Sequence, residues 1–299
     1  MNPQKNGTTK KENRKKVIIH AGRHKTGTSY LQQFFGKNSD AFLKNHSILY
    51  PDSGKHQYFQ YHHDLIDHLG TRSRSKSEII ENFFVEVSQK DPKTILLSSE
   101  YLSRSTIDES FLNKIKFNLG NFDVSLLFYF RQPDDFLCSR YAQHVKVGVL
   151  AYPQDIMTIT AELDYEKFLS RYENVFQKTF IYGRSYEVAK STGLINDFSD
   201  WIKIPEIKNF PTPDRERNKR LPWLYLRLLW RANKLPIARS FVTADLFVSL
   251  FIKLANLLPN VFDGDRPLTN TEAENIKKEN NASNERALTK YRGCYGDRT

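Results

Sequence analysis

Short runs of β-branched and aromatic residues alternate along the chain with segments whose apolar residues recur at helical spacing. Four of these runs predict buried strands, namely Val17–Ala21, Thr94–Ser99, Val124–Phe130 and Thr179–Gly183. Amphipathic helices are predicted for Ser29–Asn38, Lys76–Gln89, Tyr165–Phe176, a segment that begins near Asp134, and much of the last 30 or so residues. This alternation is typical of an α/β fold with a parallel sheet covered by helices on both faces, which binds ligands beyond the carboxyl ends of its strands.

The pattern also predicts the domain organisation. Residues 1–16 are basic, lack apolar positions and are expected to be a disordered tail, whereas residues 17–299 are expected to form a single α/β domain with a helical C-terminal part. The longest apolar stretch, Ala244–Leu258, is interrupted by Asp245 and Lys253 and is shorter than the ~20 residues that span a bilayer. We therefore expect it to be a buried or interfacial helix.

Charge and cysteine content narrow the classes of partner and compartment. The chain has 45 lysines and arginines against 34 aspartates and glutamates, a net charge of +11, which favours a polyanionic partner without choosing one. Two cysteines, Cys138 and Cys294, are too few for a disulfide framework or a four-thiolate zinc site. The basic N-terminal stretch has no apolar run of the kind a secretory signal needs, so we expect a cytoplasmic protein.

The run HAGRHKTGTSYLQ, from His20 to Gln32, connects the first predicted strand to the first predicted helix. A glycine-bearing loop in this position directs backbone N–H groups and a helix N-terminus at an anion. A nucleoside-triphosphate loop would have the pattern GxxxxGK[ST], but here Thr28 follows Gly27 and the lysine, Lys25, lies two positions before that glycine. Lys25 is therefore expected to contact an anionic group that lies against the loop, rather than the more distant β- and γ-phosphates of a nucleoside triphosphate.

Two residues that can contact an anion follow another predicted strand. Arg131 directly follows the run Val124–Phe130, and Ser139 comes eight residues later in the next predicted helix. An arginine can clamp a phosphate dianion through two N–H groups while a hydroxyl donates beside it.

These two motifs resemble those of the sulfotransferases that use 3′-phosphoadenylyl sulfate (PAPS), and most closely the bacterial members that act on carbohydrates. The resemblance extends over roughly Val17 to Gly293, although His24 stands where most of the family has proline. It implies a P-loop-like fold and transfer of a sulfuryl group to a hydroxyl of a carbohydrate, either a polysaccharide, including an anionic one, or a glycolipid. The cosubstrate-binding residues that it implies are Arg23, His24, Lys25, Thr26, Gly27, Thr28, Ser29, Arg131 and Ser139.

The implied reaction needs charge stabilisation and a base. Lys25 would stabilise the charge that develops on the departing phosphate oxygen, and no metal is expected. Glu100, which follows the second strand at the same sheet edge, is the first candidate for the base, and His63, beside His62, is the second. Four histidines, His56, His62, His63 and His68, lack the cysteines or dense carboxylates that would favour a zinc site.

Other functions stay open at this point. A P-loop kinase or NTPase would use Glu100 as a magnesium residue, but it would not need Arg131 and Ser139. Nucleic-acid binding has only charge in its favour and is not expected. Residues 213–262 are expected to form a helical subregion on the acceptor side. For Leu221–Leu258 within it, rich in tryptophan, leucine and arginine, three interpretations stay open: a helical subdomain packed on the sheet, which is favoured, a lining of the acceptor channel, or a peripheral element on the inner face of a membrane.

Overall fold

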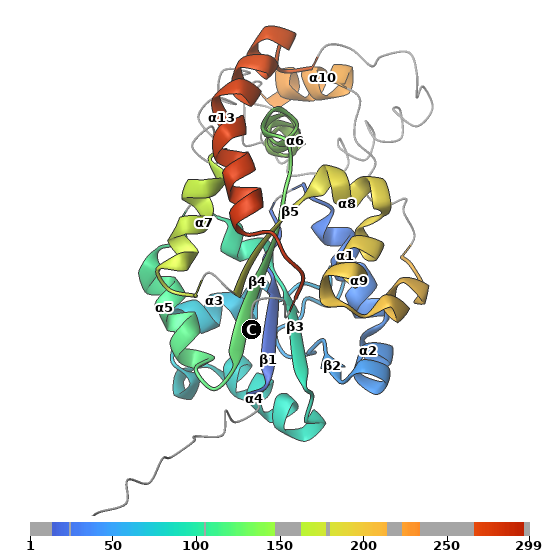
Figure 1. The fold of residues 1–299 in the computed structure, drawn as a ribbon, viewed down its shortest axis with the longest axis vertical. Helices are drawn as coiled ribbons and strands as arrows, with labels where there is room; N and C mark the ends of the chain where they lie inside the picture. The colour runs from blue at the N-terminus through green and yellow to red at the C-terminus, as the bar shows by residue number, and fades with distance from the viewer. Residues whose placement is uncertain are drawn as a thin grey trace, which may run out of the picture.

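A five-stranded parallel sheet forms the centre of the computed structural model, which describes residues 14–23, 25–104, 106–146, 163–177, 180–213, 223–233 and 266–295 (Figure 1). The strands are β1 (Lys16–His20), β2 (Ile48–Leu49), β3 (Thr94–Ser98), β4 (Asp123–Phe130) and β5 (Ile181–Ser185). Their order in the sheet is β2-β3-β1-β4-β5, and every pairing is parallel. The α/β class expected from the sequence is thus confirmed.

Helices cover both faces of this sheet. The α-helices of the described residues are α1 (Thr28–Lys37), α2 (Ser39–His46), α3 (His63–Thr71), α4 (Glu78–Lys90), α5 (Glu109–Asn118), α6 (Pro133–Lys146), α7 (Tyr165–Glu173), α8 (Tyr186–Thr192), α9 (Leu194–Ile202), α10 (Trp223–Asn233) and α13 (Asn270–Lys290). Short 3₁₀ helices lie at Arg74–Lys76, Glu100–Ser103 and Pro205–Asn209. In Figure 1, α3, α5 and α7 lie on one side of the sheet, and α1, α2, α8 and α9 on the other.

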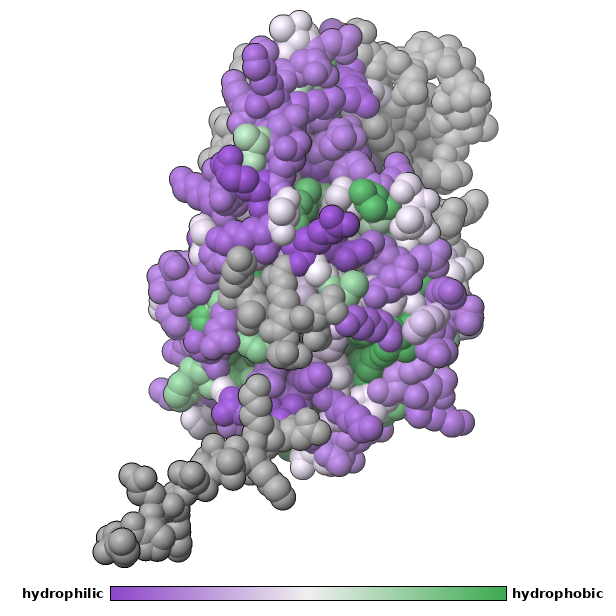
Figure 2. Space-filling model, in the orientation of Figure 1, coloured by the Kyte–Doolittle hydropathy of each residue, from purple (hydrophilic) through white to green (hydrophobic). Residues whose placement is uncertain are grey.

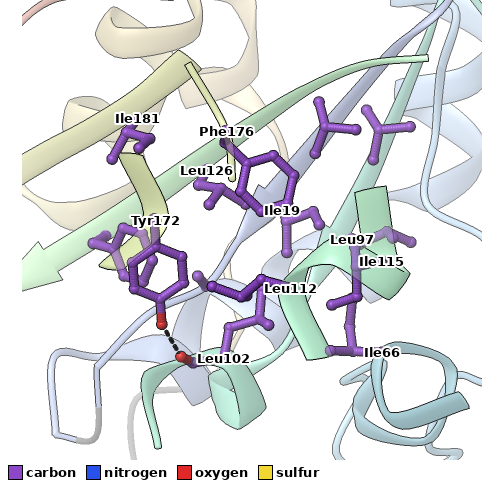
Figure 3. Close-up of a cluster of buried hydrophobic side chains, with 14 of the residues drawn as sticks. Ile19, Ile66, Leu97, Leu102, Leu112, Ile115, Leu126, Tyr172, Phe176 and Ile181 are labelled. Carbon is purple, nitrogen blue, oxygen red and sulfur yellow. Dashed lines mark hydrogen bonds between the residues drawn. The ribbon is translucent and has the colours of Figure 1, made fainter. Parts of the chain in front are cut away.

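Alternate residues of each strand enter two separate cores. In β1, Val17 and Ile19 pack in the cluster under α3, α4, α5 and α7, whereas Ile18 packs in the cluster under α1, α2 and α9. Figure 3 shows part of the first cluster, where the hydroxyl of Tyr172 donates to the carbonyl oxygen of Leu102 and ties α7 to the segment after β3. Burial on both faces explains why the strands appear in the sequence as nearly continuous apolar runs.

A buried ionic network fixes the edge formed by β4, β5 and α9. Arg184 donates from Nε and Nη2 to the two carboxylate oxygens of Asp197, at 2.7 and 2.5 Å. Tyr129 donates from its hydroxyl to Oδ2 of the same carboxylate, at 2.9 Å. The predicted strand Thr179–Gly183 is wrong by about two residues, because β5 pairs with Leu126–Phe130 and extends through Arg184 to Ser185.

The upper end of the molecule in Figure 1 is helical, as expected for the C-terminal part. There α6, α10 and α13 share a third apolar cluster that includes Leu137, Trp223 and Ile276. Of the subregion 213–262, the structure describes residue 213 and α10, and the stretch Ala244–Leu258 lies outside the described residues. None of the described helices has both the length and the apolar character needed to cross a bilayer. The face in Figure 2 carries mostly hydrophilic side chains, with small hydrophobic patches between them.

Candidate functional site

The candidate site lies at the carboxyl edge of three neighbouring strands. β1 is hydrogen-bonded to β3 on one side and to β4 on the other, with His20 beside Ser98 and Leu127. The loop that holds Lys25 follows β1, Glu100 lies two residues after β3, and Arg131 directly follows β4. The topology therefore brings together three segments that are spread over about a hundred residues of sequence.

The loop between β1 and α1 has a backbone that favours glycine at two positions. Gly22 and Gly27 have positive φ angles of 39° and 75°. A Cβ on Gly22 would lie 2.6 Å from Oγ1 of Thr28, and one on Gly27 would lie 2.3 Å from Cδ1 of Leu194. The loop is therefore a tight backbone cradle that a side chain at either glycine would disrupt.

Hydroxyl groups close this cradle from within. Thr26 donates to the carbonyl oxygen of Arg23 at 2.7 Å, and Thr28 donates to the same oxygen at 3.3 Å. Ser29 is exposed in the first turn of α1, and Gly27 at the N-cap leaves that turn without a side-chain cap. The first N–H groups of a helix have no partner within it, so this ten-residue helix offers them to an anion. His24 lies outside the described residues.

The side chain of Arg23, which the resemblance assigns to the cosubstrate, is buried. Its side chain is 1% exposed, and its guanidinium carbon lies 4.6 Å from the ring centres of both Phe136 and Phe168 and 5.1 Å from that of Tyr165. The guanidinium thus packs among aromatic faces of α6 and α7 as a cation–π contact. The carbonyl oxygen of Arg23 organises the loop by accepting from both Thr26 and Thr28.

Lys25 turns its side chain toward α6. It has a positive φ of 68°, and its ammonium group donates to Oε1 of Gln143 at 2.7 Å. Burial, together with the nearby cations Lys146, Arg140 and Arg131, lowers the pKa of Lys25 to about 8, and Glu100 opposes this shift. This lysine is therefore partly desolvated and surrounded by other cations, and an anionic ligand would stabilise its charged form.

Arg131 is joined directly to the same loop. Its Nη1 donates a long hydrogen bond of 3.4 Å to the carbonyl oxygen of Lys25, and its Nη2 lies 3.4 Å from a carboxylate oxygen of Asp135. The guanidinium carbon lies 5.5 Å from the ring centre of Tyr186. The Nε atom is buried and has no hydrogen-bond partner among the described residues. A buried donor of this kind fits an anion as its ligand.

Helix α6 places Gln143 and Lys146 near Lys25, whereas only Ser139 of this helix was predicted as a site residue. Ser139, predicted as a partner of Arg131, lies about two turns into α6 and is partly buried. Gln143 and Lys146 follow it at the spacing that keeps residues on one helix face, and Arg140 is adjacent. Both Gln143 and Lys146 lie near Lys25, the first by contact and the second by its effect on the lysine pKa. The spacing is visible in the sequence, but the direction in which that face points is not.

The two candidate bases lie near the carboxyl end of β3. Glu100 begins the 3₁₀ helix Glu100–Ser103, is partly buried, and acts electrostatically on both Lys25 and His20. His63 begins α3, where its Nδ1 lies 3.0 Å from Oγ of Ser99 and its ring stacks on Tyr61 at 3.9 Å.

His62 has a structural position. Its Nδ1 accepts from the N–H of Ser98 at 3.2 Å, and its Nε2 donates to the carbonyl oxygen of Pro51 at 2.9 Å. Burial lowers the pKa of His62 to about 4, so the ring is neutral at pH 7. His68 contacts Ser77, and the described residues contain no group of three or more histidine, cysteine, aspartate or glutamate side chains that could hold a metal ion.

A pocket of about 300 Å³ lies between α6, α10 and the segment before α13. It is lined by three aromatic rings, three arginines, a leucine and a proline, namely Tyr141, Trp223, Leu226, Arg227, Trp230, Arg231, Arg266 and Pro267. Arg266 lies 3.7 Å from a carboxylate oxygen of Asp134, in the first turn of α6. Since Tyr141 follows Ser139 by two residues, the pocket lies on a different side of α6 from the face that carries Ser139 and Gln143.

Comparison with solved structures gives a distant likeness. No protein-family model matches the chain, and no curated protein matches it. Among solved structures, the chain is similar to a sulfotransferase from Alicyclobacillus acidocaldarius, with 14% sequence identity, 80% of this chain and 99% of that chain covered, and a TM-score of 0.41. A likeness this distant carries no argument about function, so the residues of the site must carry the assignment themselves.

Proposed function

We propose that the protein is a sulfotransferase that moves a sulfuryl group from PAPS to a hydroxyl of a carbohydrate. The observation that carries this proposal is the contact between two anion-binding segments, in which Nη1 of Arg131 reaches the carbonyl oxygen of Lys25 at 3.4 Å. PAPS carries an anion at each end of its ribose, one as the 5′-phosphosulfate and the other as the 3′-phosphate. Two adjacent cationic sites suit such a ligand, whereas ATP has no 3′-phosphate to occupy the second.

The residues present fit the cosubstrate. The glycine cradle and the open first turn of α1 would hold the 5′-phosphosulfate, with the hydroxyls of Thr28 and Ser29 beside it. Arg131 would hold the 3′-phosphate with Ser139, and its buried Nε supplies a donor that lacks a partner among the described residues. Tyr165 donates to the carbonyl oxygen of Arg131 and fixes the arginine at the end of β4.

Chemically, a bond forms between the acceptor oxygen and sulfur while the bond between sulfur and the phosphate oxygen breaks. Lys25 neutralises the negative charge that grows on the departing phosphate oxygen, which is worth about 3–4 kcal/mol for a well-placed donor. Glu100 accepts the proton that the acceptor hydroxyl loses, and a base of this kind contributes ~10²–10⁴-fold. His63, held by Ser99, is the alternative acceptor of that proton.

A P-loop kinase or NTPase is the competing function. It would need the lysine after the last loop glycine to reach the β- and γ-phosphates, and Thr28 occupies that position. In the structure Lys25 instead lies within the loop and bonds to Gln143 of α6. The loop therefore lacks the lysine that a P-loop kinase or NTPase would need.

The test is a titration cycle with two nucleotides and two proteins. Wild-type protein and the Arg131→Met variant are titrated calorimetrically with 3′,5′-diphosphoadenosine and with 5′-AMP, and Arg72→Met, which removes an exposed arginine at the end of α3, is the matched control. We expect Arg131→Met to weaken the diphosphate by roughly tenfold or more and to leave 5′-AMP nearly unchanged. If the variant lost the same affinity for both nucleotides, Arg131 would not bind the 3′-phosphate, and the main support for the proposal would be gone.

A further inference from the structure

One face of α6 extends the cationic site beyond the residues that the cosubstrate needs. Ser139, Gln143 and Lys146 are separated by four and three residues, so they lie within an arc of about 60° on the helix surface. Gln143 contacts the ammonium group of Lys25 at 2.7 Å, which shows that this face points toward the loop. Lys146, one turn further on, is therefore directed to the same side of α6.

The order of groups along α6 separates two ends of the site. Lys25 spans them, because its carbonyl oxygen bonds to Arg131, before α6 begins, while its ammonium group bonds to Gln143. At 1.5 Å per residue, Gln143 lies about 6 Å along the axis from Ser139, and Lys146 lies about 4.5 Å further. Lys146 is thus on the far side of the Lys25 ammonium group from Arg131 and Ser139.

At this far end Lys146 supplies a cation that the cosubstrate does not use. Lys146 is partly buried, and burial lowers its pKa. Lys146 acts on Lys25 as a like charge, as does Arg140 from its position next to Ser139, and Glu100 is the carboxylate that opposes them. Cations gathered and desolvated in this way are stabilised when an anion binds between them.

We propose that Lys146 forms a subsite for an anionic group on the acceptor, so that the acceptor is an acidic saccharide with a carboxylate or sulfate close to the hydroxyl that is modified. This inference rests on the proposed function. In that reaction the acceptor oxygen must approach the sulfur from the side opposite the departing phosphate oxygen. The Lys25 ammonium group marks the departing oxygen, and the far end of α6, with Lys146, is the end that the 3′-phosphate does not occupy.

The test uses a matched pair of oligosaccharides. An oligosaccharide that contains uronic acid and its carboxyl-reduced form differ only in charge, and both are titrated into protein saturated with 3′,5′-diphosphoadenosine at pH 7. Lys146→Met removes the cation, and Lys90→Met removes an exposed lysine of the same size at the end of α4 as the control. A sulfated oligosaccharide and its desulfated form are a second pair, and phosphatidylglycerol vesicles are a third arm.

We expect the acidic member of at least one pair to bind wild-type protein and Lys90→Met about tenfold more tightly than its neutral counterpart. In Lys146→Met that preference is lost, while the affinity for 3′,5′-diphosphoadenosine stays within about threefold of wild type. The subsite is refuted if no acidic oligosaccharide is preferred, if the preference survives in Lys146→Met, if only the vesicles bind through Lys146, or if the variant loses the diphosphate instead. Failure of wild-type protein to bind the diphosphate would refute the proposed function itself, which is a separate result.

Discussion

The most specific consequence of the proposed site concerns 3′,5′-diphosphoadenosine, the nucleotide that remains when PAPS has given up its sulfuryl group. The affinity of the protein for this nucleotide should depend on pH through Lys25. Burial, together with Lys146, Arg140 and Arg131, lowers the pKa of this lysine to about 8. The anion is bound by the protonated ammonium, so the affinity for 3′,5′-diphosphoadenosine must fall as the pH rises through that value. The two phosphates do not contribute to the change, since their second ionisation, near pH 6, is complete in this range.

The expected magnitude follows from the fraction of protein with a charged lysine. With a pKa of about 8, that fraction is roughly nine-tenths at pH 7 and roughly one-tenth at pH 9, so the dissociation constant rises by about tenfold, or about 1.4 kcal/mol. An ordinary lysine, with a pKa near 10.4, would change the affinity by less than about a tenth over the same range. The difference between the two cases is large enough to measure by calorimetry.

The assay is a calorimetric titration at pH 7, 8 and 9, in buffers of different ionisation enthalpy, which also reports proton uptake on binding. Lys25→Arg is the matched control, because a guanidinium stays charged throughout this range and its affinity should be flat. Binding should take up close to one proton at pH 9 in wild-type protein and none in Lys25→Arg. A flat wild-type profile, or the same slope in both proteins, would refute the assigned environment of Lys25.

Three further outcomes are expected. Glu100→Gln should lower turnover by about 10²–10⁴-fold with little change in diphosphate affinity, as measured by initial rates, and an unchanged rate would transfer the base role to His63. Tyr129→Phe removes a hydrogen bond to the buried carboxylate of Asp197 and should lower the free energy of unfolding by about 1.5–3 kcal/mol in urea titrations; a loss below 0.5 or so would contradict the network. His62 has a folded-state pKa of about 4, so below pH 6.5 the unfolded chain takes up a proton that the folded chain does not. Stability contributed by His62 is therefore lost as the pH falls from about 6.5 to 4, by about 1.4 kcal/mol per pH unit, and His62→Gln should show a shallower dependence in urea unfolding at pH 7 and 5.

The central sheet could be predicted from the sequence because its signal is local. β1, β3 and β4 are continuous apolar runs, and a strand buried on both faces needs such a run wherever it lies in the sheet. α1 and α6 were predicted for a similar reason, since each follows a strand and carries apolar residues at helical spacing.

Other helices could not be found in this way. α2, α3 and α5 are eight to ten residues long, and α3, with the sequence HDLIDHLGT, contains two histidines and a glycine. Its stability comes from burying Leu65, Ile66 and Leu69 against the core under the sheet. Short helices of this kind depend on tertiary packing more than on local preference, so the sequence of the segment alone predicts only a polar region.

The candidate site divides along the same line. The loop with Lys25 and the pair Arg131 and Ser139 were predicted from their resemblance to family motifs, and the parallel strand order places the loop beside Arg131. The role of Gln143 was not visible, because helical spacing does not tell which side of α6 faces the loop. The burial of Arg23 was not visible either, because aromatic rings around its side chain come from two distant segments, α6 and α7.

The most direct measurement of the central claim is a calorimetric titration of the full chain with 3′,5′-diphosphoadenosine, 5′-AMP and ATP, each with and without magnesium. We expect tight binding of the diphosphate that does not depend on magnesium and that weakens sharply when the 3′-phosphate is removed. Magnesium-dependent binding of ATP, with no preference for a nucleotide that carries a 3′-phosphate, would contradict the proposed sulfotransferase function and support a P-loop kinase or NTPase.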